Sequence, residues 1–211
     1  MRYERKYKIE LLSLPLVHQS IRLHPASFRK IFPDRQVNNI YFDTSDFNTY
    51  KDNVMGIAER RKFRVRWYGK DLETILNPNF EIKIKNNQLG DKTVERLASF
   101  DLGNLNAITK QIQTLAHTYK PLIPTLLNSY HRSYYGTPDK KFRITIDSQI
   151  CYHSLINNTN INGRKIEDEE IVLELKYHEA LDSQTDRITQ YFPYRLSKSS
   201  KYVTGMEITL Q

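Results

Sequence analysis

The sequence predicts an α+β fold built on a closed, eight-stranded antiparallel β-barrel with a charged interior and helices outside. Three observations support this prediction. Alternation of polar and apolar residues with a period of two recurs along most of the 211-residue chain, the polar members are charged in several segments, and helical periodicity is confined to three short stretches. Because Gly and Pro are scattered and no linker-like tract divides the chain, residues 1–211 are expected to form a single domain.

Nine segments alternate in this way, one more than the eight strands of the predicted barrel. Because successive side chains of a strand point to opposite faces, each of these segments has one apolar and one polar face. In chain order they are Tyr3–Ile9, Gln36–Asp43, Ala58–Tyr68, Phe80–Lys85, Lys92–Ala98, Leu127–Tyr135, Lys141–Asp147, Ile171–Tyr177 and Tyr202–Leu210.

Apolar residues at helical spacing predict three outer helices. The first follows Ser13, the second follows Asn104, and the third lies shortly before the final strand. Their apolar positions are Leu14, Val17 and Ile21, then Leu105, Ile108, Ile112 and Leu115, then Leu181, Ile188 and Tyr191.

The strands are unusual because their polar face is largely cationic. In residues 62–67, Lys62, Arg64 and Arg66 share one face, while apolar side chains occupy the other. Residues 4–9, 81–85, 142–147 and 173–177 repeat the pattern. An open sheet with one face in water would explain any one of these strands. Like charges on neighbouring strands repel, so five such strands favour either interleaved acids or a closed barrel whose charged interior surrounds a polyanion.

The overall charge also predicts an anionic partner. Lys and Arg number 32 against 24 Asp and Glu, which gives a net charge of +8 and a pI near 9.4. Nucleic acid, anionic membrane, phosphorylated metabolites and polyphosphate are all compatible with this balance.

Composition further predicts a cytoplasmic protein without an integral membrane segment. The mean hydropathy is −0.63, no apolar run approaches the roughly 20 residues of a membrane-spanning helix, and residues 1–6 lack the apolar core of a signal peptide. The single cysteine, Cys151, excludes a disulfide within the chain and a cysteine-rich zinc site.

Five short segments resemble the VTC catalytic domain, the polyphosphate-polymerase branch of the triphosphate tunnel metalloenzymes. They are residues 40–47 (IYFDTSDF), 50–53 (YKDN), 61–69 (RKFRVRWYG), 80–83 (FEIK) and 199–202 (SSKY), and the resemblance extends from Tyr3 to Met206. It implies an antiparallel barrel whose tunnel binds a nucleoside triphosphate or the product chain together with a divalent metal, here Mn²⁺ or Mg²⁺.

The resemblance also implies roles for individual residues. Glu174 matches the metal-binding carboxylate, and Glu207 in the predicted last strand is a second candidate ligand or a partner for a tunnel lysine. Lys62 has no counterpart in the family's set. The implied catalytic residues are Lys6, Arg64, Arg66 and Lys83, and the implied phosphate-binding residues are Lys92, Arg132, Arg143 and Lys201.

The first strand departs from the wider superfamily. Those enzymes usually begin with an ExExK motif, and Arg2, Glu4 and Lys6 stand at the corresponding positions here. One carboxylate that helps hydrolytic members bind metal and activate water is therefore missing. This difference favours the polymerase branch over a phosphohydrolase or cyclase.

The leading functional hypothesis is a metal-dependent polymerase that transfers the γ-phosphoryl group of ATP to a growing polyphosphate chain, with ATP and polyphosphate as partners. The alternatives are a non-catalytic module that binds polyphosphate or inositol phosphates, and another triphosphate-processing tunnel enzyme. A nucleic-acid binder is disfavoured because Phe63 and Trp67 lie on the face opposite Arg64 and Arg66, where they could not stack on bases held by those arginines.

Overall fold

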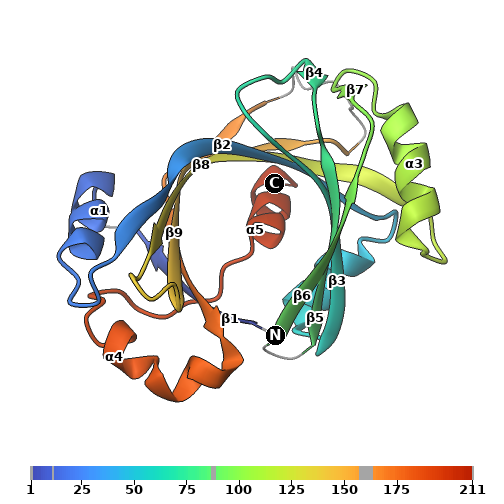
Figure 1. Ribbon diagram of the computed structural model, residues 1–211. Coiled ribbons are helices and arrows are strands. Elements are labelled where there is room, and N and C mark those ends of the chain that lie inside the picture. Colours follow the sequence, from blue (N-terminus) through green and yellow to red (C-terminus); the bar gives the residue numbers. More distant parts are fainter. Residues whose placement is uncertain (1, 11, 87–88, 157–163, 211) are drawn as a thin grey trace.

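The computed structural model describes residues 2–10, 12–86, 89–156 and 164–210, and eight of its antiparallel strands close into a ring (Figure 1). Around the ring the order is β9, β11, β1, β6, β5, β3, β2 and β8, after which β8 pairs with β9 again. The α+β class and the antiparallel ring are therefore confirmed. The strands of the ring are β1 (Arg2–Ile9), β2 (Arg29–Thr44), β3 (Glu59–Tyr68), β5 (Asn79–Asn86), β6 (Leu89–Arg96), β8 (Leu122–Gly136), β9 (Phe142–Ser154) and β11 (Ile171–His178).

Three shorter strands lie outside the ring. The strand β10 (Ile166–Asp168) extends the sheet beside β9, and β4 (Thr74–Ile75) pairs with β7 (Phe100–Asp101) in a separate two-stranded sheet.

Two apolar cores lie on the outer face of the ring. Helix α3 (Asn106–Ala116) contributes Ile108 and Ile112 to one core, which also contains Trp67. Helix α1 (Leu14–Arg22), the short helix α4 (Asp186–Thr189) and the 3₁₀ helix η1 (Glu179–Gln184) pack over the other. The predicted arrangement, in which the apolar faces of the strands point outward against helices, is therefore present.

Helix α2 (Asn48–Met55) was not predicted from the sequence, because its residues show no strong apolar periodicity. A buried carboxylate fixes its first turn: Asp43 accepts hydrogen bonds from the backbone N–H groups of Thr49 at 2.8 Å and Tyr50 at 2.9 Å.

In the part of the chain that the structure describes, no helix combines the length and apolarity needed to cross a membrane.

The predicted strand Tyr202–Leu210 is wrong, because Lys201–Thr209 form helix α5. Tyr202 and Met206 are four residues apart and both are buried, so a single helical face explains what resembled strand alternation. The Ser200 side chain accepts a hydrogen bond from the Val203 N–H and caps the helix. Glu207 consequently lies on this helix, where it is exposed.

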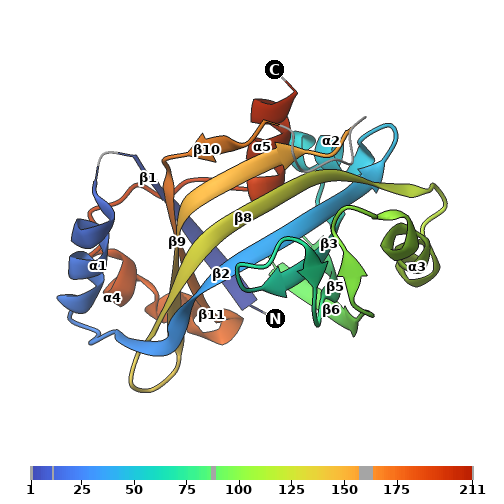
Figure 2. The same cartoon turned by 90° about the horizontal axis from the view of Figure 1, so that it is seen from above.

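Helix α5 lies within the outline of the ring when the ring is viewed end on (Figure 1). In the perpendicular view it lies at one end of the ring, and the turn that joins β8 to β9 lies at the other end (Figure 2). Its side chains Tyr202 and Met206 pack with Tyr41, Leu126 and Tyr152 in a third apolar core. The interior of the ring is therefore apolar at the α5 end.

Close packing of α5 depends on Gly205. A Cβ atom at this position would lie 2.4 Å from Leu126 Cδ2 and 2.6 Å from Tyr152 Cδ1, and both of those side chains are buried. We expect Gly205→Ala to destabilise the protein by about 1–3 kcal/mol through overpacking. For a chain of this size each kcal/mol lowers the melting temperature by roughly 2–4 °C.

Thermal unfolding measured by circular dichroism tests this expectation, with Gly103→Ala as the matched control. A Cβ atom at Gly103 would meet nothing within 4 Å, so the control should melt with the parent. Equal melting temperatures for Gly205→Ala and the parent would contradict the packing argument.

Candidate phosphate-binding site

Charged side chains on the interior face of the ring contact one another across intervening strands. Lys83 on β5 donates to Glu4 on β1 at 2.9 Å, although β6 lies between these strands. Contacts that skip a strand require side chains on the concave face, so these groups point into the ring. We call the charged side chains assembled in this way the interior network: Glu4, Lys6, Lys62, Arg64, Arg66, Glu81, Lys83, Lys92, Arg132, Asp147, Glu174, Lys176 and Lys201.

Glu81 organises one side of the interior network. Its carboxylate accepts from Arg64 Nε at 2.8 Å and from Lys92 Nζ at 2.9 Å, and Arg66 Nη1 lies 3.8 Å away. Burial opposes ionisation of Glu81, but the nearby Arg64, Arg66 and Lys92 outweigh burial and hold its pKa below the ordinary value. Glu81 is therefore a charged group that neutralises part of the cationic surface.

Neutral side chains orient Arg66. Its Nε donates to Asn39 Oδ1 at 2.7 Å and its Nη2 donates to Tyr130 Oη at 3.0 Å. Asn39 is itself fixed by donating to Asn128 Oδ1 at 2.7 Å. Two of its N–H groups are thus engaged by uncharged partners, and its one carboxylate neighbour among the described residues, Glu81, lies 3.8 Å away.

Asp147 and Glu174 organise the opposite side. Asp147 is completely buried and accepts from Arg132 Nη2 at 2.7 Å and from Lys201 Nζ at 2.5 Å. Glu174 lies 2.9 Å from Lys176 Nζ and 3.4 Å from Lys6 Nζ, and Arg132 Nη2 lies 3.7 Å from it. Burial disfavours the charged form of Glu174, yet Lys176, Lys6 and Arg132 hold its pKa well below the ordinary value.

The start of helix α5 brings backbone and hydroxyl oxygens to the interior network. Lys6 Nζ donates to the backbone oxygen of Ser199 at 2.9 Å, and Lys62 Nζ donates to Ser200 Oγ at 2.7 Å. Burial, followed by repulsion from Lys6 and Lys83, lowers the pKa of Lys62 well below its ordinary value.

The network as a whole is cationic. Among the described residues it contains nine Lys and Arg side chains and four carboxylates. Several lysines stay partly accessible: 22% of the Lys6 side chain, 29% of Lys83 and 51% of Lys92 is exposed. An excess of accessible, fixed positive charge is a surface for a polyanion.

The structure brings most of the implied site residues together. Eight of them belong to the interior network: Lys6, Arg64, Arg66, Lys83, Lys92, Arg132, Glu174 and Lys201. Arg143 is exposed near the β8–β9 turn and lines a separate cavity with Phe32 and Lys140. Glu207, predicted on a strand as a second metal ligand, lies exposed on α5 and forms no network contact within the described residues.

The site roles implied by the resemblance leave out five members of the interior network: Glu4, Lys62, Glu81, Asp147 and Lys176. Each lies on the charged face of an alternating strand, so strand periodicity was the available signal. Which carboxylate pairs with which cation could not be read from that signal, because most partners, such as Glu4 and Lys83, lie on different strands.

The carboxylates of the interior network are dispersed. Within residues 2–10, 12–86, 89–156 and 164–210, no group of three or more His, Cys, Asp or Glu side chains could hold a metal ion. Glu174 is ionised, and Mg²⁺ commonly uses one or two carboxylates together with phosphate oxygens. This donor set fits a metal that binds together with a phosphate ligand.

The fold and the interior network define an α+β protein whose antiparallel ring presents a cationic inner face. The model of the VTC domain matches residues 1–210, and the chain belongs to this family. A search of curated protein sequences finds no match.

Solved structures share the fold at low sequence identity. A "putative adenylate cyclase" from Vibrio parahaemolyticus has a TM-score of 0.57 at 10% identity, over 96% of this chain and 97% of that one. A protein described in the same words from Bacillus halodurans has a TM-score of 0.55 at 14% identity, over 95% and 94%. HpAC1 from Hippeastrum, described as having a dominant triphosphatase activity, has a TM-score of 0.52 at 12% identity, over 100% and 98%.

The affinity for tripolyphosphate should depend on pH through the ionisation of Lys83. Burial lowers its pKa to about 8, although Glu4 partly offsets this effect. A polyanion favours the charged ammonium and raises the pKa again, so binding should take up protons from about pH 8 upward. The affinity for tripolyphosphate should accordingly fall as the pH rises through this range.

Titration calorimetry in two buffers of different ionisation enthalpy measures the proton uptake. The parent should take up about one proton more than Lys83→Arg at pH 9 and nearly the same number at pH 7, because arginine stays charged at both values. Equal uptake by the two proteins at pH 9 would exclude Lys83 as the titrating group.

Proposed function

We propose that this protein is a metal-dependent polyphosphate polymerase that transfers the γ-phosphoryl group of ATP to a growing polyphosphate chain within the ring. The interior network has nine Lys and Arg side chains and four carboxylates, and this excess of positive charge on the concave face is the observation that carries the proposal. Membership of the VTC family supports it.

The interior network has the properties that phosphoryl transfer requires. Such transfer depends mainly on alignment of the phosphates and on neutralisation of charge on the transferred group, with little covalent work by the protein. Arg64, Arg66 and Arg132 supply planar guanidinium groups that suit paired phosphate oxygens, and lysines supply mobile point charges. The acceptor is an ionised terminal phosphate, so the reaction requires no general base.

The divalent cation and its ligand are part of the proposal. Glu174 would hold Mn²⁺ or Mg²⁺, and the ion when bound would supply positive charge that neutralises the phosphates. Lys6, Lys176 and Arg132 surround this carboxylate and would contact the same phosphates. Arg143 and Glu207 are less favourably placed, the first near the β8–β9 turn and the second on the exposed side of α5.

Two other functions use the same network. A module that binds polyphosphate or inositol phosphates without turnover would also need the cations, and a different triphosphate-processing enzyme would share both the cations and the metal. Nucleic acid fits less well, because Phe63 and Trp67 are buried in the outer core with α3 and cannot stack on bases.

One assay separates these functions. Purified protein is incubated with ATP and either Mn²⁺ or Mg²⁺, and both ADP and long-chain polyphosphate are measured. The polymerase produces both. A triphosphate hydrolase releases phosphate without polymer, and a binding module leaves ATP intact.

Substitution of Glu174 tests the role of its carboxylate. We expect Glu174→Gln to lower metal-stimulated ADP release by orders of magnitude, because it removes the charge that would hold the metal. In EDTA the variant should bind tripolyphosphate as well as the parent or better, because Lys6, Lys176 and Arg132 lose an anionic neighbour. Calorimetry and an ADP-release assay give the two measurements.

Glu81→Gln is the matched control, since Glu81 is an equally buried carboxylate that also contacts three cations. This variant should keep the Mn²⁺ concentration that gives half-maximal rate, whatever its maximal rate. Unchanged turnover and metal dependence in Glu174→Gln would remove the metal assignment and leave Glu174 as a partner for lysines.

A further inference from the structure

At the end of the ring opposite α5, three aromatic rings surround one guanidinium group. The Arg35 Cζ atom lies 5.5 Å from the centroid of Phe32, 5.4 Å from that of Tyr68 and 5.4 Å from that of Tyr134. Phe32 and Tyr134 also contact each other edge to face, with centroids 5.7 Å apart. We call these four residues the aromatic mouth.

Arg35 differs from the arginines of the interior network in its partners. Arg64 and Arg132 each contact a carboxylate. For Arg35, the described residues provide ring contacts but no ion pair. The rings are also accessible, since 43% of Phe32 and 46% of Tyr68 is exposed. Exposed rings around an unneutralised cation form a surface suited to a flat, electron-rich ligand that carries negative charge.

The aromatic mouth continues directly from the interior network. Tyr68 follows Arg66 by two residues on β3, and Tyr134 follows Arg132 by two residues on β8. Arg35 pairs with Arg132 in the register of β2 and β8. Two residues of a strand span roughly 7 Å, so a ligand with phosphates at Arg66 and Arg132 would reach the rings after one ribose.

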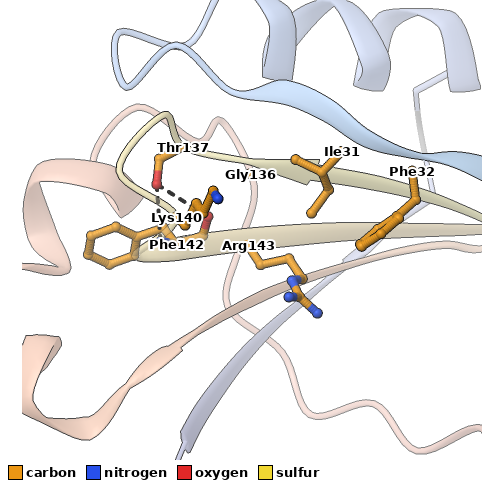
Figure 3. A pocket seen from close by; sticks show the side chains of 7 residues that line it. All are labelled: Ile31, Phe32, Gly136, Thr137, Lys140, Phe142 and Arg143. Carbon is orange, nitrogen blue, oxygen red and sulfur yellow. Dashed lines mark hydrogen bonds between the residues drawn. The ribbon is translucent and has the colours of Figure 1, made fainter.

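A cavity of about 350 Å³ adjoins the mouth through Phe32 (Figure 3). Ile31 and Gly136 give it an apolar part, and Lys140 and Arg143 add positive charge. This combination of apolar wall and cations is typical of a small-molecule site. Ile31 and Phe32 come from β2, whereas Gly136, Lys140 and Arg143 come from β8, β9 and the turn between them.

We propose that the aromatic mouth binds the nucleobase and ribose of a nucleoside triphosphate whose phosphates extend into the interior network. The proposal rests on the proposed function and adds the direction from which the nucleotide enters, namely the end remote from α5. Stacking on Phe32 and Tyr68 uses the π-face that every base has, so different bases should bind with similar affinity.

Calorimetry with three ligands tests the aromatic mouth: ATP, ribose 5-triphosphate, which lacks the base, and tripolyphosphate. The parent should bind ATP more tightly than ribose 5-triphosphate. Phe32→Ala and Tyr68→Ala should each weaken ATP binding by about five- to tenfold, within the range for loss of one stacked base. Both variants should bind tripolyphosphate within about twofold of the parent, because they leave the interior network intact.

Three controls make the outcome specific. Tyr68→Phe keeps the ring and should keep the parent's ATP affinity, and Tyr119→Ala removes a fully exposed tyrosine that takes part in none of the ring contacts described above. GTP should bind within a few fold of ATP. Melting temperatures verify that each variant is folded.

Two results would overturn the assignment of the mouth. One is unchanged ATP affinity in both alanine variants, and the other is an equal loss of ATP and tripolyphosphate affinity, which would mean that the mouth acts on phosphate. Results that contradict the proposed function are distinguishable from these. The parent would then either bind neither tripolyphosphate nor ATP, or bind both ligands without turnover.

Discussion

The pairing of buried cations with buried carboxylates is the interaction on which this structure depends. A closed ring of strands has a concave face that removes side chains from bulk water, and an unpaired charge in such a place is strongly destabilising. Glu81, Asp147 and Glu174 each contact at least two cations. They allow arginines and lysines to be concentrated there before any ligand binds, and they leave the network with an excess of positive charge.

Because the neutralisation is only partial, the individual cations differ in how much carboxylate charge lies beside them. Arg132 shares Asp147 and Glu174 with lysines, and its position is fixed on two sides. Lys62 is partly buried, has cationic neighbours and has only a hydroxyl as partner among the described residues; burial first, and then repulsion from Lys6 and Lys83, lowers its pKa well below the ordinary value. A polyanion bound in the ring would supply negative charge to cations such as Lys62, which have no carboxylate partner among the described residues.

The two ends of the ring have different chemistry because different segments cover them. Helix α5 fills one end with Tyr202 and Met206 and begins with Lys201, which binds Asp147. The two serines just before it, Ser199 and Ser200, accept hydrogen bonds from Lys6 and Lys62. The other end exposes Phe32 and Tyr68 around Arg35. A nucleotide bound as we propose would therefore have one orientation in this asymmetric ring, with its base at the aromatic end.

Local periodicity by itself predicted the eight strands of the ring, three helical stretches outside it and the charged inner face, because side-chain direction along a strand follows from the backbone alone. The same reasoning failed at residues 202–210, where tertiary packing of Tyr202 and Met206 against Tyr41 and Leu126 stabilises a helix. Only the tertiary structure decided which carboxylate meets which cation, that Lys176 and Asp147 join the site, and that Arg35 lies among three rings. Most of these contacts join residues far apart in the sequence, as between Lys201 and Asp147, and the closure of the ring, which no local pattern encodes, sets their distances.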